Sequence, residues 1–167
     1  SRPRVALDWV LDRLIRAALG LLMLLPYDRR VPVCGWLLAH LAAPLMGYRG
    51  RVRDNLALVM PDLPKTEVRR MTRAVPDNLG RTFIELYSGQ EFARRVAAEP
   101  LQGPGVPLIE AAHQAGRPVL LVTGHIGNYD AARAALLARG YKVGGLYRPM
   151  NNAFFNDHYV KAIQKIG

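Results

Sequence analysis

Residues that build metal and redox centres are scarce in this chain. Its 167 residues include a single cysteine, Cys34, so no disulfide can form within the chain. Cys34 lies in an apolar run, and we interpret it as a small core or lipid-facing residue rather than a nucleophile. The sequence also lacks Cys/His clusters at metal-ligand spacing, a Walker loop and a G-x-G-x-x-G fingerprint. We therefore expect no metal and no cofactor.

Acidic residues are also few, with 13 Asp and Glu against 23 Lys and Arg, which gives a formal net charge of +10. Such an excess attracts the protein to anionic surfaces, either nucleic acid or lipid headgroups. The arginines cluster beside leucine-rich runs, and the aromatic interleaving typical of single-strand binders is missing. The composition therefore favours a membrane partner and disfavours nucleic acid.

The first apolar stretch is too short to cross a bilayer. Residues 5–25 predict a helix whose polar side chains, Asp8, Asp12 and Arg16, recur every four positions along one side. The uncharged part of this helix, residues 17–25, falls short of the roughly 20 residues that a span requires. An amphipathic helix in the membrane interface fits the pattern, with a buried core helix and a signal peptide as alternatives. Against the signal peptide, acidic residues interrupt its start and no small-residue cleavage site follows.

A second apolar run, residues 31–47, follows after Pro26. Arginines flank both runs, and each cation near an anionic surface contributes about 1 kcal/mol to membrane binding. The flanking arginines are Arg29, Arg30, Arg49, Arg51 and Arg53. Residues 1–50 are therefore predicted to be a membrane-associated helical region.

Further helices are predicted from the spacing of apolar residues and from turn signals. Pro76 is expected to break or kink the helical region around it, because proline removes a backbone donor. Between residue 51 and the Gly103-Pro104-Gly105 loop the predicted helices are residues 51–60, 65–74, 78–88 and 91–98, and residues 106–115 follow that loop.

The last third of the chain predicts a βαβ unit. Residues 118–123 and 142–147 are short apolar runs typical of buried strands, and residues 130–139 between them predict a helix closed by Gly140. Parallel strands joined by a crossover helix place the two strand ends at the same sheet edge, where ligands bind. The predicted fold class is therefore α/β, with His125 and Arg148 just beyond the two strand ends.

His125 and Asp130 are the candidate catalytic pair. An imidazole can accept a proton near neutral pH, and a carboxylate can hold its tautomer and stabilise the imidazolium. Asn128 can cap the helix that follows, and the backbone amides around Gly127 and Asn128 would face outward at its start, where an oxyanion or a phosphate can bind. Arg148 is the candidate anion clamp, since its planar fork matches phosphate oxygens. The simpler alternative is a capped turn with a structural histidine and an arginine in an ordinary ion pair.

The segments GHIGNYD and LYRPMNN, together with RVRDNLALVMPDLPKTEVRRM and NLGRTFIELY, resemble the lipid A biosynthesis lauroyl (late) acyltransferase family, within the lysophospholipid acyltransferase superfamily. The resemblance extends from about Leu21 onward. It implies a glycerolipid-acyltransferase-like sheet and O-acyl transfer from an acyl thioester to a hydroxyl of a phosphorylated lipid A precursor. Its implied donor is acyl carrier protein or acyl-CoA, and its implied location is the cytoplasmic face of the bacterial inner membrane.

Two features depart from the family pattern. Position 130 is Asp where this branch more often has Glu, and family members continue for a further region of comparable size after the position that matches Gly167. Residues 51–167 are therefore expected to be the N-terminal portion of an acyltransferase α/β domain, completed by a C-terminal half or by a partner chain. Two alternatives stay open. One is transfer to another lipid, such as a lysophospholipid, an ornithine lipid or a mannosylated phosphoinositide, and the other is a truncated, non-catalytic membrane subunit.

Overall fold

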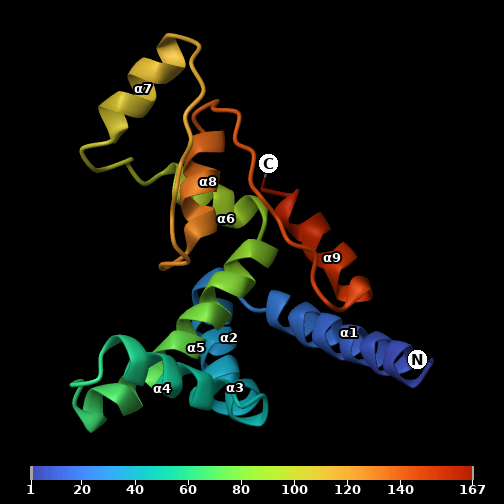
Figure 1. Ribbon diagram of the computed structural model, residues 1–167. Helices are drawn as coiled ribbons and strands as arrows, with labels where there is room; N and C mark the ends of the chain where they lie inside the picture. Colours follow the sequence, from blue (N-terminus) through green and yellow to red (C-terminus); the bar gives the residue numbers. More distant parts are fainter. Residues whose placement is uncertain (1, 167) are drawn as a thin grey trace. The chain divides into compact units, whose positions relative to one another are not determined.

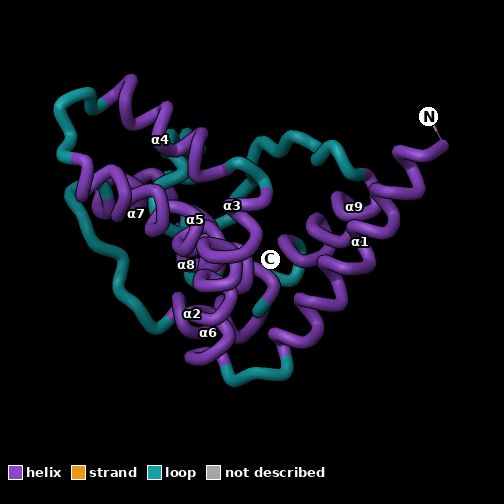
Figure 2. Tube along the Cα trace, turned by 90° about the horizontal axis from the view of Figure 1, so that it is seen from below, coloured by secondary structure: helices purple, strands orange, loops and turns teal. Residues whose placement is uncertain are grey.

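The computed structural model describes residues 2–166, with side chains from residue 5 onward. Helices account for 68% of the chain, and the described residues contain no strand (Figures 1 and 2). The chain forms two compact units, one ending at Ser88 and the other beginning at Gly89. Each unit buries residues of its own, so each is held by its own helix contacts.

The first unit packs around a small apolar core. Its helices are α1 (Arg2–Met23), α2 (Tyr27–Leu37), α3 (Ala43–Leu45), α4 (Tyr48–Val59) and α5 (Lys65–Tyr87), and a π-helical turn, η1 (Leu38–Ala42), joins α2 to α3. Leu19, Val31, Cys34 and Ile84 form the core, and burying each large apolar side chain contributes about 1.5–3 kcal/mol. Burial raises the pKa of the Cys34 thiol to about 11, so the thiol stays protonated near neutral pH. The interpretation of Cys34 as a core residue is confirmed.

Helices α2 and α5 approach each other closely in this unit. A Cβ on Gly80 would lie 2.7 Å from the carbonyl oxygen of Cys34 and 2.9 Å from the Cα of Gly35. No side chain fits at that distance, so only glycine at position 80 lets the two backbones meet. This contact positions α2, and with it the core residues Val31 and Cys34.

The predicted break in the helical region at Pro76 is wrong, and the alternative of a kink stays a prediction. α5 runs without interruption from Lys65 to Tyr87 and contains Pro76, whose side chain is fully buried. A proline inside a helix removes one backbone hydrogen bond and costs about 3 kcal/mol in isolation. Buried neighbours along the same helix, Ile84 and Leu86 among them, supply packing that offsets this cost and that local propensity does not report.

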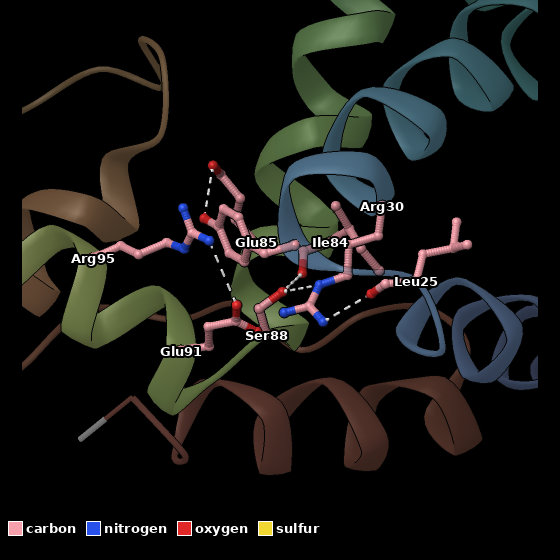
Figure 3. Close-up of polar contacts among 8 residues, drawn as sticks. Leu25, Arg30, Ile84, Glu85, Ser88, Glu91 and Arg95 are labelled. Carbon is pink, nitrogen blue, oxygen red and sulfur yellow. Dashed lines mark hydrogen bonds and ion pairs between the residues drawn. The ribbon is translucent and has the colours of Figure 1, made fainter.

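Arg30 is a buried polar centre of the first unit and does not face a headgroup. It is 5% exposed, and its Nε donates to Ser88 Oγ at 3.1 Å while its Nη1 donates to the Leu25 carbonyl at 3.4 Å (Figure 3). Ser88 in turn donates to the Ile84 carbonyl at 2.7 Å. The guanidinium also lies over the ring of Tyr27, 5.1 Å from its centroid. Arg30 thus joins the start of α2 to the end of α5, and the expectation that it binds lipid is not met.

The first helix keeps much of its apolar surface uncovered. Val5, Leu7 and Leu14 are 55%, 57% and 61% exposed, whereas Asp12 is fully buried and lies 3.7 Å from Arg16. Within residues 2–166, no single helix has both the length and the apolar character to cross a membrane. One pair does pass that test jointly, Tyr27–Leu45 with Tyr48–Val59, and the pair is bent by 89°. Membrane attachment by the N-terminal region stays a prediction.

The second unit contains the candidate catalytic and anion-binding residues. Its helices are α6 (Gln90–Ala97), α7 (Val106–Gln114), α8 (Tyr129–Leu137) and α9 (Ala153–Ile163). α6 packs against α8, with Phe92 and Leu136 among the buried residues. Gly140 has φ +85°, and the Tyr141 amide returns to the Leu136 carbonyl at 3.1 Å. That pattern is a Schellman motif, so the predicted glycine termination of this helix is confirmed.

The predicted α/β sheet and its βαβ unit are wrong. Residues 117–123 and 141–150 are irregular segments on either side of α8, and neither forms a strand (Figure 2). Leu120 and Val122 are each 89% exposed, whereas the prediction required them to be buried in a sheet. An apolar, β-branched run becomes a strand only where another strand supplies ladder hydrogen bonds, and no described residue pairs with these runs in that way. The second unit, like the first, is helical.

Candidate functional site

The loop before α8 places the candidate residues at a capped helix start. Asn128 has extended φ/ψ angles of −97° and 92°, and its Oδ1 accepts from the Asp130 amide at 3.1 Å. Gly127 has φ +59°, a left-handed conformation that glycine adopts without strain. The capping role expected for Asn128 is confirmed, and Gly127 supplies the reversal that leads the chain from His125 into α8.

Asp130 is buried in the first turn of α8 and pairs with Arg133. The Arg133 Nε lies 3.5 Å from Asp130 Oδ1, with the side chains 17% and 8% exposed. Burial raises the pKa of the Asp130 carboxyl above its usual value, and the Arg133 charge and hydrogen bond oppose that rise. The Arg133 Nη2 also donates to the Ile163 carbonyl at 3.0 Å. Arg133 thus holds Asp130 and ties α8 to α9.

His125 is exposed and contacts Tyr129, not Asp130. The two rings lie edge to face, with centroids 4.7 Å apart at 73°. The hydrogen bonds and ion pair of the Asp130 side chain go to Arg133 instead. The two candidate catalytic residues therefore flank one capped turn, and the structure does not join them by a hydrogen bond.

Aromatic residues bridge this turn to the segment that carries Arg148. Tyr159 of α9 interacts with Tyr129 through a side-chain hydrogen bond, and its ring stacks on Tyr147 with centroids 6.2 Å apart. Burial is the largest cause that raises the pKa of the Tyr159 phenol, followed by Tyr129, so the phenol stays neutral. Tyr129 and Tyr159 thus connect His125 to Tyr147, although the latter two residues lie in different loops.

Arg148 is exposed in the loop between α8 and α9, and Asn156 holds the residues around it. The Asn156 Oδ1 accepts from the Tyr147 hydroxyl and from the Met150 amide, the latter at 2.9 Å. Asn152 caps α9 by accepting from the Phe155 amide at 3.1 Å. The two bonds to Asn156 lie on either side of Arg148 and Pro149, so α9 determines the position of the arginine's backbone.

These residues offer groups suited to proton transfer and to anion binding. His125 presents an accessible imidazole, the start of α8 presents backbone amides, and Arg148 presents an exposed guanidinium. From residue 2 to residue 166, no group of three or more His, Cys, Asp and Glu side chains could hold a metal ion. The groups present suit acyl transfer assisted by a general base.

Comparison with known families decides what kind of protein this is. The family model described as bacterial lipid A biosynthesis acyltransferase matches residues 2–164, nearly the whole chain. The chain belongs to this family. It is thus an acyltransferase of the lipid A biosynthesis type, as the sequence motifs indicated. Searches among curated proteins and among solved structures found no match.

Several residues of this lipid A-type acyltransferase were not identified from the sequence. Arg133, Asn156 and Tyr159 each contact a residue of the candidate site or its neighbour, and each lies on a helix face that only the packing of α8 and α9 defines. A weak signal was available for Arg133, which is three residues after Asp130 and so shares its helix face. Asn156 and Tyr159 had no comparable signal, because their partners lie outside α9.

Proposed function

We propose that this acyltransferase moves a fatty acyl group from a thioester on acyl carrier protein to a hydroxyl of a phosphorylated lipid A precursor. The observation that carries the proposal is the Asn128-capped turn, which holds His125 directly before α8 in a chain of the lipid A acyltransferase family. Acyl-CoA is the alternative donor.

His125 is the proposed general base. It removes the proton of the acceptor hydroxyl, whose oxygen attacks the thioester carbonyl carbon. The tetrahedral oxyanion then collapses, the carbon–sulfur bond breaks, and the departing thiolate takes the proton back from the imidazolium. The amides of Gly127 and Asn128 bind either the oxyanion or an acceptor phosphate. No covalent acyl-enzyme and no cofactor is required.

Asp130 is the proposed partner that orients His125. Its carboxylate pairs with Arg133 in the substrate-free chain, at 3.5 Å, which is long for a charge-assisted hydrogen bond. Catalytic hydrogen bonds are often long or misaligned before substrate binds. We propose that Asp130 turns to the imidazole in the substrate complex, while Arg148 binds the acceptor phosphate as a bidentate clamp.

His125→Ala tests the proposed mechanism. With an acyl carrier protein thioester and a lipid A precursor as substrates, the rate should fall by about 10²–10⁴-fold, as for loss of a general base. The matched control is His113→Ala, which removes an exposed histidine on α7 whose ring contacts Tyr141. Circular dichroism establishes that both variants fold. Near-normal turnover by the His125 variant would contradict the mechanism.

The proposed location is the cytoplasmic face of the bacterial inner membrane. The apolar residues exposed along α1 and the basic excess of the chain both suit an anionic bilayer surface. Fractionation of bacterial cells tests the location, and recovery of the full-length protein in the soluble fraction would contradict it. A panel of acceptors in the same assay, including lysophospholipid and ornithine lipid, tests the choice of lipid A precursor.

A further inference from the structure

A cleft lined by basic side chains lies between α5 and the π-helical turn η1, within the first unit. Its volume is about 600 Å³, and we refer to it as the arginine cleft, lined by His40, Thr66, Arg69, Arg70, Arg73 and Asp77 among others. Positions 69, 70 and 73 share one face of α5, because residues three and four apart are neighbours on a helix. All three arginines are exposed to solvent.

The carboxylates that the structure describes leave part of the positive charge of the arginine cleft unbalanced. Glu67 pairs with Arg70 at 2.8 Å, and Asp77 pairs with Arg81 at 2.5 Å. Across the described residues 2–166, no carboxylate forms an ion pair with Arg69 or Arg73. Two guanidinium groups one helical turn apart can therefore receive an external anion, and their planar forks match the oxygens of a phosphate.

The opposite wall of the cleft is the π-helical turn, a form of helix that occurs frequently at functional sites. His40 lies on this turn, with its Nδ1 3.0 Å from the Trp36 carbonyl and its ring stacked on Trp36 at 5.0 Å. Because a carbonyl can only accept, Nδ1 carries the proton, and Nε2 is the acceptor in a neutral ring. The cleft thus combines two cations with an acceptor for a hydroxyl group.

Apolar side chains are exposed on the π-helical turn and on the residues that follow it in the chain. Leu41 in η1 is 53% exposed, Leu45 in α3 is 89% exposed, and Met46 is 67% exposed. A basic cleft whose wall at His40 continues in the chain into uncovered apolar residues suits a molecule with an anionic head and an apolar tail. A soluble polyanion would make no use of the apolar residues.

We propose that the arginine cleft binds the phosphate of an anionic glycerophospholipid headgroup, with Arg69 and Arg73 as the phosphate ligands and His40 facing the headgroup hydroxyls. The residues of the arginine cleft belong to the first unit, and the candidate acyl-transfer residues belong to the second. The existence of the phosphate site does not depend on the proposed reaction.

The test is binding to phosphatidylcholine vesicles that contain phosphatidylglycerol, measured by flotation. Arg69→Gln/Arg73→Gln should weaken binding by about tenfold or more, since each basic residue near an anionic surface strengthens it severalfold. The matched control, Arg94→Gln/Arg117→Gln, removes the same charge from exposed arginines elsewhere in the chain. Equal weakening by both double variants would overturn the proposal in favour of diffuse attraction.

A charge-preserving variant separates a phosphate site from a basic surface. Arg69→Lys/Arg73→Lys keeps both charges but loses the bidentate forks, so binding should fall nearly as far as with the Gln variant. Wild-type affinity in the Lys variant would overturn the assignment of the two arginines. Glycerol phosphate, added at constant ionic strength, tests whether a free phosphate ester occupies the same site. Competition with vesicle binding by wild type, but not by the Gln variant, supports the site, and the absence of competition by wild type contradicts it.

Discussion

Replacing Arg133 by Met should destabilise the chain by an amount that depends on pH. The change removes the cation beside the buried Asp130 carboxylate and the donor to the Ile163 carbonyl. Breaking a buried ion pair from one side costs about 3 kcal/mol, and an unsatisfied carbonyl bond costs about 1 kcal/mol. For a chain of this size, each kcal/mol lowers the Tm by about 2–4 °C.

The pH dependence follows from the raised pKa of Asp130. A carboxyl whose folded pKa lies above its usual 3.8 destabilises the fold when ionised, so stability increases as pH falls through the folded pKa. Arg133 lowers that pKa, so without it the folded pKa rises further. The pH range over which stability depends on the ionisation of Asp130 then extends to higher pH. The loss relative to wild type should therefore be about 3–4 kcal/mol near pH 7 and smaller near pH 4, approaching about 1 kcal/mol as Asp130 becomes protonated and only the carbonyl bond is missing.

Thermal unfolding followed by circular dichroism at both pH values measures this difference. The control is the same Arg133 substitution in an Asp130→Asn background, where no carboxyl titrates and the loss should be nearly independent of pH. An equal loss at both pH values in the wild-type background would refute the reasoning, because it would mean that Arg133 does not act on a charged Asp130.

Two further predictions concern packing and the Arg148 segment. Gly80→Ala should cost about 1–3 kcal/mol of unfolding free energy, since its Cβ would lie 2.7 Å from a backbone oxygen, whereas Gly50→Ala in α4, with nothing within 4 Å, should stabilise by up to about 1 kcal/mol. Chemical denaturation distinguishes the two, and equal effects would contradict the close α2–α5 contact. Asn156→Ala should raise the KM for the lipid acceptor about tenfold with little change in thermal stability, because Arg148 is no longer held. Asn156→Asp should restore the KM, since a carboxylate oxygen accepts both bonds, and a normal KM in the Ala variant would show that Asn156 does not position Arg148.

Local signals in the sequence identified several helices and placed their ends to within a few residues. The predicted helices around residues 51–60, 91–98 and 106–115 correspond to α4, α6 and α7, because apolar spacing and Gly/Pro signals act within a few residues. The Asn128 cap and the helix termination at Gly140 were predicted from signals that are equally local. The family, too, followed from motifs read along the chain.

Contacts between residues far apart in the chain could not be predicted from the sequence. Nothing in the arginine pattern distinguished Arg30, which is buried beside Ser88, from Arg29, which is exposed. The same is true of Asp130, which pairs with Arg133 and not with the predicted His125. A charged side chain takes its partner from whatever folding brings near, and that neighbour is set by helix packing.

The sequence by itself determined the family, the cap at Asn128, the helix termination at Gly140 and the order of the candidate residues along the chain. Only the tertiary structure decided that residues 118–123 and 142–147 are not strands, that α5 continues through Pro76, and that Asn156 and Tyr159 flank the Arg148 segment. Caps and amphipathic faces depend on neighbours along the chain, and the sequence records those directly. Strand pairing, tolerance of a buried proline and side-chain partners depend on residues far apart in the chain, and only the folded arrangement brings them together.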